Sequence, residues 1–305
     1  MRCIICGLEK EASKEHIIPE AMGNKKFVTY KVCQECNNKL GTNVDHYLTD
    51  YIVIKMIRKE LGLLGKDEKE IKIFPSSVSD TKGEKFVFRN DIPSIVPKVE
   101  LKEDVLHIEA ENVKEAFKLA KKKLERYGYT NEKIEESLKN YKENESKRYQ
   151  PIFQISADID KGRYLLTGIK IAYEFACEVL DDTYFDDDIA KIFHKELYKA
   201  VNSNKNTLST SVDYCTIKKY VTLIQKESIE IKERIESLAN NITPPPRHIC
   251  LLHDSADHKL ICEVILLFEN MMSFTVMLSK NAARYNMNGK CKVAVVLENG
   301  DVLSM

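Results

Sequence analysis

Apolar residues spaced three and four positions apart predict several amphipathic helices along the 305-residue chain. The first covers residues 44–61, and the most regular one in the second half covers residues 163–180. The same spacing predicts further helices at residues 112–127, 131–146, 188–201 and 217–240. Residues 131–146 are highly charged with little apolar face, which favours a solvated helix or a connector over a binding element.

Short apolar runs bounded by turn residues predict strands at residues 71–74, 85–88, 105–109 and 151–156. After the proline run 244–246, the tail is β-rich, with strands expected at 249–252, 262–268, 273–278 and 292–297 and a hairpin turn at Asn299-Gly300. The fold class is therefore α+β. We expect a small module at residues 1–65 and a larger α+β domain with its own core at residues 66–305, with further divisions near 150 and 244 as an option.

The composition is that of a soluble protein, with 43% hydrophobic and 31% charged residues. The longest apolar stretches fall well short of the roughly 20 residues that a membrane span needs. The formal net charge is zero, which argues against a protein that coats nucleic acid by charge alone but leaves room for a local basic groove. Met1-Arg2-Cys3 leads straight into a cysteine motif, so we expect no cleavable signal and a cytoplasmic protein.

Two CxxC pairs, Cys3/Cys6 and Cys33/Cys36, stand within the first 36 residues. Cysteines so spaced can hold one side of a metal ion from a single tight turn, so the four predict a tetrahedral structural zinc site. The alternative is four unrelated buried cysteines. The remaining five cysteines lie in apolar contexts, where a free cysteine behaves as a small hydrophobic residue, and this favours a reducing compartment.

Between the two pairs lies Glu15-His16, and Asn37 follows the last cysteine. Phosphodiester hydrolysis needs a base for water and a divalent cation on the scissile phosphate. Histidine suits the first task because its pKa lies near neutrality. Carboxylate and amide oxygens suit the second because Mg²⁺ prefers oxygen ligands. The spacing therefore indicates a nuclease-like site, although Asn37 could simply cap a helix.

The residues Cys3-x2-Cys6, Glu15-His16-Ile17-Ile18-Pro19, Gly23 and Cys33-x2-Cys36-Asn37-x-Lys39 resemble the zinc-binding form of the HNH endonuclease family. The resemblance covers roughly residues 1–45. It implies a ββα-metal module, in which a two-stranded hairpin and a helix hold one catalytic divalent ion.

The family pattern assigns a role to each matching residue. His16 matches the general base, Glu15 the acidic metal ligand before it, and Asn37 the ligand on the helix, with Asn38 as an alternative. The family's middle Asn, which braces the loop that carries the histidine, falls at Val28 in this chain. Thr29 or Asn24 is the expected substitute.

These observations predict a metal-dependent HNH endonuclease that cuts DNA, with a structural Zn²⁺ and a catalytic Mg²⁺ or Mn²⁺; an RNA substrate is a further possibility. By analogy, we expect a role in restriction or phage defence, with cleavage gated by residues 66–305. The same region could form a homo-oligomer. The alternative function is a non-catalytic zinc module that binds nucleic acid or protein. Five basic residues could contact the phosphates of a bound nucleic acid: Lys25, Lys26, Lys31, Lys39 and Arg58.

Overall fold

The chain forms two compact units in the computed structural model, residues 1–71 with 157–305 and residues 72–156. The structure describes residues 1–64, 69–102, 105–139, 150–154, 159–180, 182–203, 212–223, 237, 242–267, 272–287 and 289–304. Every helix among these residues is too short or too polar to cross a membrane. The mixed α+β class expected from the sequence is confirmed.

The N-terminal module has the expected ββα order, β1 (Ala12–His16), η1 (Glu20–Met22), β2 (Val28–Cys33) and α1 (Gln34–Leu40). β1 and β2 pair antiparallel, with His16 opposite Val28 and a bulge between Ser13 and Glu15. The single helix predicted at 44–61 is instead three segments, η2 (Gly41–Asp45), α2 (His46–Thr49) and α3 (Ile52–Glu60). The chain turns at Tyr51, which has an extended backbone, and this turn lets both Leu48 and Ile54 be fully buried.

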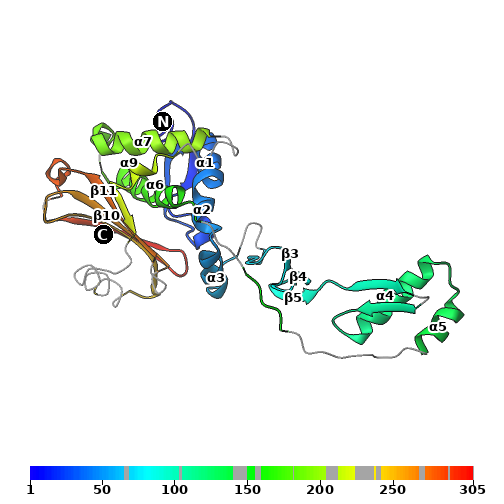
Figure 1. Ribbon diagram of the computed structural model, residues 1–305. Helices are drawn as coiled ribbons and strands as arrows, with labels where there is room; N and C mark the ends of the chain where they lie inside the picture. The colour runs from blue at the N-terminus through cyan, green and yellow to red at the C-terminus, as the bar shows by residue number, and fades with distance from the viewer. Residues whose placement is uncertain are drawn as a thin grey trace. The chain divides into compact units, whose positions relative to one another are not determined.

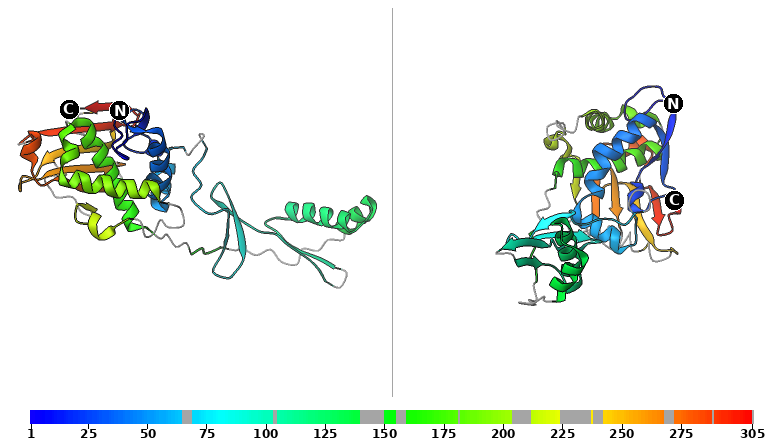
Figure 2. Two further views of the ribbon diagram at one scale, coloured as in Figure 1. Left: turned by 90° about the horizontal axis from the view of Figure 1, so that it is seen from above. Right: turned by 90° about the vertical axis from the view of Figure 1, so that its right-hand side faces the viewer.

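A six-stranded antiparallel sheet forms the other half of the first unit, in the order β13-β12-β9-β10-β11-β8. Its strands are β8 (Val221–Leu223), β9 (Pro246–Asp254), β10 (Leu260–Leu266), β11 (Met272–Ser279), β12 (Cys291–Leu297) and β13 (Val302–Ser304). Helices α6 (Lys161–Val179) and α7 (Asp188–Asn202) lie side by side against the sheet (Figures 1 and 2). Shorter helical segments, η4 (Asp182–Asp186), α9 (Tyr214–Ile217) and η6 (Ala282–Tyr285), complete this unit.

Helix α6 lies between the sheet and the N-terminal module. Towards the sheet it packs closely at Gly168, where an added Cβ would come within 2.5 Å of the Phe274 ring. Towards the module, Phe175 contacts Phe27 with ring centroids 5.6 Å apart, and Thr167 donates a hydrogen bond to the Val44 carbonyl. One continuous hydrophobic core therefore runs from Ile4 to the sheet.

The observed units differ from the expected division after residue 65, because the module shares its core with α6 and the sheet. A separate core for residues 66–305 was expected, but the buried apolar residues of α6 and the sheet join those of the module in one core. The segment that forms its own unit is residues 72–156. The physical reason is that the small ββα module has too few apolar residues to close a core alone and buries Ile4, Ile17 and Met22 within the shared core.

The second unit contains a three-stranded sheet, a two-stranded sheet and two helices. The first sheet is β3 (Ser77–Ser79), β4 (Lys85–Arg89) and β5 (Ile92–Ile95), and the second is β6 (Lys98–Lys102) and β7 (Val105–Glu109). The helices are α4 (Val113–Arg126) and α5 (Asn131–Lys139). The strand predicted at 71–74 is wrong, since the first strand of this unit begins at Ser77. Residues 140–146 of the charged helix predicted at 131–146 lie outside the described residues.

The helix predicted at 217–240 is also wrong in its first part. Helix α9 ends at Ile217, and Val221–Leu223 pairs with Phe274–Val276 as strand β8. Residues 224–236 and 238–240 lie outside the described residues. The available edge of β11 supplies backbone partners and Val221 is buried, so tertiary pairing overrides the local helical spacing.

His248 on β9 ties the sheet to the N-terminal module. Its Nδ1 accepts a hydrogen bond from the Leu267 N–H at 3.2 Å, so Nε2 carries the proton and donates to the Met22 carbonyl at 2.9 Å. Burial lowers the pKa of His248 to about 3. The folded protein therefore holds this imidazole neutral, while an unfolded histidine titrates near 6.5.

We expect the free energy of unfolding to fall between pH 6.5 and pH 3 through this residue. The unfolded chain binds the proton first, so stability is complete above about pH 6.5 and decreases by up to about 1.4 kcal/mol per unit below it. Urea unfolding of wild type and of His248→Gln at two pH values measures this. The decrease in the free energy of unfolding from about pH 7.5 to about pH 5 should be smaller in the variant by about 2 kcal/mol. Equal decreases in wild type and variant would contradict the conclusion that His248 stays neutral in the folded protein.

Candidate functional site

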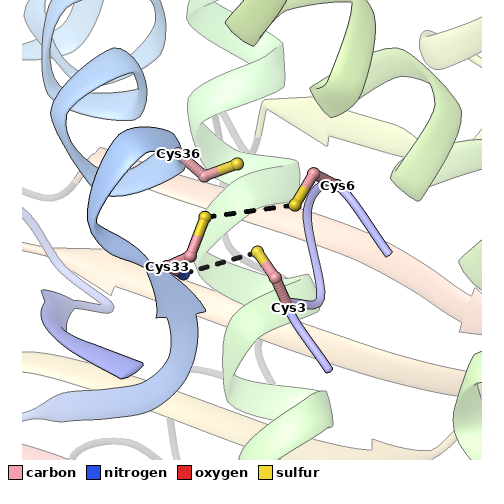
Figure 3. A group of neighbouring side chains, drawn as sticks. All are labelled: Cys3, Cys6, Cys33 and Cys36. Atoms are coloured by element: carbon pink, nitrogen blue, oxygen red, sulfur yellow. Dashed lines mark hydrogen bonds between the residues drawn. The ribbon is translucent and has the colours of Figure 1, made fainter. Parts of the chain in front are cut away.

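Four cysteine thiols gather at the junction of the N-terminal turn with helix α1. The Sγ atoms of Cys3, Cys6, Cys33 and Cys36 all lie within 4.8 Å of one another, and those of Cys6 and Cys33 are 4.0 Å apart (Figure 3). Four sulfur atoms around one zinc ion at about 2.3 Å would be roughly 3.8 Å apart. The cluster could therefore hold a zinc ion as the spacing predicted.

Local backbone structure brings the two pairs together. Gly7, with a φ of +71°, closes the first turn and donates its N–H to the Cys3 carbonyl at 2.8 Å. Cys33 ends β2 and caps α1, which places Cys36 on the first turn of that helix. Tyr173 of α6 donates a hydrogen bond to the Ile4 carbonyl at 3.0 Å. The turn is thus held by both the hairpin and α6.

The donor set fits a closed structural metal site. Burial raises the pKa of Cys36, and the neighbouring thiols raise it further. Thiolates this close together and this buried repel one another, so a shared cation is what would let them ionise. Four cysteine ligands leave no open position for substrate.

His16 lies at the end of β1 and is half-buried. Its Nε2 has no hydrogen-bond partner within the described part of the chain. Burial lowers the pKa of His16 below its ordinary value, and Glu20 opposes this shift. A neutral imidazole with an uncommitted nitrogen can accept a proton, which is what a general base must do.

Asn37 projects from α1 onto the same strand. Its Nδ2 donates to the Lys14 carbonyl at 2.7 Å and to the Ser13 hydroxyl at 3.1 Å. No hydrogen bond to its Oδ1 is found among the described residues. Helix α1 is thereby fixed against β1, and an amide oxygen remains for a cation. Asn38, the alternative ligand, is exposed and accepts a hydrogen bond from Gln34.

Glu15, expected beside Asn37 as a metal ligand, has a different partner. Its carboxylate is buried, with Oε1 2.6 Å from Nζ of Lys170 on α6. The same ammonium group lies 3.2 Å from Glu174 and 3.5 Å from Asp45. Burial raises the pKa of Asp45 to about 7 and that of Glu174 well above its ordinary value. The structure therefore places Glu15 in a buried ionic cluster, which we call the Lys170 cluster (Lys170, Glu15, Asp45 and Glu174).

Asn24 is one of the two residues expected to substitute for the family's middle Asn. It is fully buried, and its Nδ2 donates to the carbonyls of Ile18 and Phe27 at 2.6 and 2.8 Å. Its Oδ1 accepts from the Phe27 N–H at 2.8 Å. Thr29 instead donates to Glu178. Asn24 thus closes the loop between β1 and β2.

The basic residues expected along the phosphates are mostly engaged within the protein. Lys26 pairs with Asp301 at 2.6 Å, Lys31 donates to the Cys177 carbonyl at 2.7 Å, and Lys39 pairs with Glu35 at 2.7 Å. Lys25 is exposed. Arg58 is buried and donates to the carbonyls of Ala21 and Thr49, so its placement on a phosphate track is wrong.

The sequence reasoning missed Lys170 and Glu174. A signal was present, since both stand four residues apart in the helix whose apolar positions were the most regular of the second half. A charged pair on an otherwise apolar helix indicates a buried ionic contact. The spacing of residues along the sequence does not show that Lys170 pairs with Glu15 and Asp45.

Comparison with known proteins agrees with the geometry of the module. Residues 3–52 match the model of the HNH endonuclease family. No curated protein and no solved structure matches the chain significantly. The matched segment contains the four cysteines, His16 and Asn37, and it ends at the first residue of α3. Residues 3–52 therefore form an HNH-type module.

Proposed function

We propose that this protein is a metal-dependent endonuclease that hydrolyses DNA phosphodiester bonds. The observation that carries the proposal is the contact between β1 and α1, where Asn37 of α1 hydrogen-bonds to Ser13 and Lys14 of the strand that ends at His16. The match of residues 3–52 to HNH endonucleases supports nuclease chemistry. DNA is the substrate we favour, and RNA is the alternative that the same chemistry permits.

His16 and Asn37 have separate tasks in this proposal. His16 takes a proton from water, and the resulting hydroxide attacks phosphorus as the P–O3′ bond breaks. The departing O3′ takes a proton from solvent. The products are a 5′ phosphate and a 3′ hydroxyl. A Mg²⁺ or Mn²⁺ ion, when bound, stabilises negative charge on the phosphate and the departing oxygen. Asn37 would hold that ion through Oδ1, and the zinc would maintain the fold without reacting.

Plasmid cleavage tests this function. The zinc-loaded protein should nick supercoiled DNA only when Mg²⁺ or Mn²⁺ is added, and EDTA at a concentration that leaves the zinc bound should stop it. A matched RNA substrate in the same assay decides between the two nucleic acids. Absence of cleavage of either polymer across divalent ions would contradict the proposal.

Replacing Asn37 with alanine should raise the Mg²⁺ concentration needed for half-maximal cleavage. Oxygen ligands hold Mg²⁺ weakly, so the loss of one protein ligand reduces occupancy directly. Metal titrations of wild type and Asn37→Ala measure this, with Asn38→Ala as the matched control on the same helix. A lower rate at saturating metal with an unchanged titration midpoint would make Asn37 a residue that only fixes α1 to β1.

The second candidate function is a zinc module that binds nucleic acid or protein without cutting. The engagement of Glu15 by Lys170 favours this candidate, because it takes one expected ligand away from a catalytic metal ion. Nucleic-acid binding that persists with no cleavage under any divalent ion would establish it.

Restriction or phage defence is the biological setting we propose, in a cytoplasmic protein that could also form a homo-oligomer. An unrestrained nuclease is toxic, so residues beyond 65 would gate cleavage. The second unit, residues 72–156, is the part with its own fold and hence the natural candidate for target sensing.

A further inference from the structure

Lys170 is the only lysine among the described residues whose side chain is both fully buried and surrounded by carboxylates. Its Nζ donates to Glu15 Oε1 at 2.6 Å, to the His16 carbonyl at 2.7 Å and to the Ile17 carbonyl at 3.3 Å. These acceptors are consecutive along the chain at the end of β1. One ammonium group thus contacts the residue before His16, His16 itself and the residue after it.

Burial of an ammonium ion costs several kcal/mol unless close partners compensate for the lost water. Lys170 meets that condition through three hydrogen bonds and the nearby carboxylates of Asp45 and Glu174. An apolar residue at this place would leave Glu15 and two carbonyl groups buried without their donor. These hydrogen bonds therefore fix the position of the backbone at His16. The Lys170 side chain is fully buried, so a ligand cannot reach it.

The geometry points to Lys170 as a positioning residue of the nuclease site, and Glu15 as its counter-ion. This inference rests on the proposed function. The HNH match ends at residue 52, whereas Lys170 comes from α6, so this chain completes its site with a helix outside the matched module. Glu15 then acts through Lys170 on the backbone of His16, and the catalytic ion is held by Asn37 without it.

Three substitutions test the inference in the full-length, zinc-loaded protein. Lys170→Met removes the ammonium group and keeps an unbranched side chain. Glu15→Gln keeps the shape and removes the counter-ion's charge. Arg58→Met is the matched control, because Arg58 is also a buried cation that donates to module carbonyls but has no hydrogen bond to β1 among the described residues.

The first readout is the His16 ring signal in a ¹H–¹³C spectrum, assigned by its loss in His16→Ala. It should move or broaden in Lys170→Met and Glu15→Gln and stay in place in Arg58→Met. This readout needs no cleavage, so it tests positioning even if the protein proves not to be a nuclease. An unmoved His16 signal in both cluster variants would overturn the inference.

The second readout is steady-state cleavage at saturating divalent ion. Misplacement of a base by about 1 Å can cost as much as 10²-fold, so kcat should fall by at least about 10-fold in Lys170→Met with KM little changed. Glu15→Gln should also lower kcat while leaving the metal titration midpoint at the wild-type value. Arg58→Met should lower thermal stability alone.

The metal titration separates the two roles of Glu15. A shifted midpoint in Glu15→Gln, with an unmoved His16 signal, would make Glu15 a metal ligand and overturn the positioning role. If Lys170→Met fails to fold, Glu15→Gln carries the same test, since it leaves Lys170 in place. If the wild-type protein does not cleave but the His16 signal moves in the cluster variants, the nuclease function is rejected. The role of Lys170 in positioning His16 would then still hold.

Discussion

Replacing His16 with alanine should lower the rate of DNA cleavage by about 10²–10⁴-fold, the usual contribution of a general base. Its Nε2 is free of hydrogen bonds within the described residues, and burial keeps the pKa of the ring below its ordinary value. The loss should therefore appear in kcat at saturating Mg²⁺, with zinc content and the thermal midpoint close to wild type. Single-turnover nicking of supercoiled plasmid measures it.

His107→Ala is the control for this prediction, because His107 is exposed on β7 in the other unit. Its cleavage rate should equal that of wild type. If His16→Ala cuts at the wild-type rate while its metal dependence is unchanged, His16 has no part in the reaction. The base would then have to be sought outside the residues that match the family.

Replacing Cys33 with serine should remove the zinc ion and unfold the first unit. Zinc binding by four thiolates contributes on the order of 10 kcal/mol in small zinc domains, which is comparable to the whole stability of a domain. Cys33 also ends β2, begins α1 and donates its N–H to Cys3 Sγ. Because one core joins the module to α6 and the sheet, the damage should extend beyond residue 65.

Metal analysis and thermal unfolding measure both effects, with Cys215→Ser as the matched control because Cys215 is exposed and outside the cluster. The control should retain about one zinc ion per chain and the wild-type midpoint. Residues 72–156, a compact unit of their own, should keep their fold in the Cys33 variant. Native zinc content in Cys33→Ser would show that the thiol cluster holds no metal.

The chemistry of the N-terminal module could be predicted from local sequence because its ligands come from short segments. Cys3 and Cys6 share one turn, while Cys33 and Cys36 share the start of one helix. Spacing within a turn fixes which side chains can meet, so the four-thiol cluster and the family followed from the sequence. The long helix α6 followed from its apolar spacing for the same reason.

The partners of the buried charges were decided only by tertiary structure. Glu15 and Lys170 are 155 residues apart, and no local pattern indicates that a helix beyond the second unit meets β1. The same holds for β8, where an available strand edge overrode helical spacing, and for the shared core, which replaced an expected boundary after residue 65. Local sequence determined the module and the kind of chemistry it supports. Tertiary contacts decided which of these side chains are available for that chemistry. A buried charged group needs a partner of opposite charge, and that partner can come from any part of the chain.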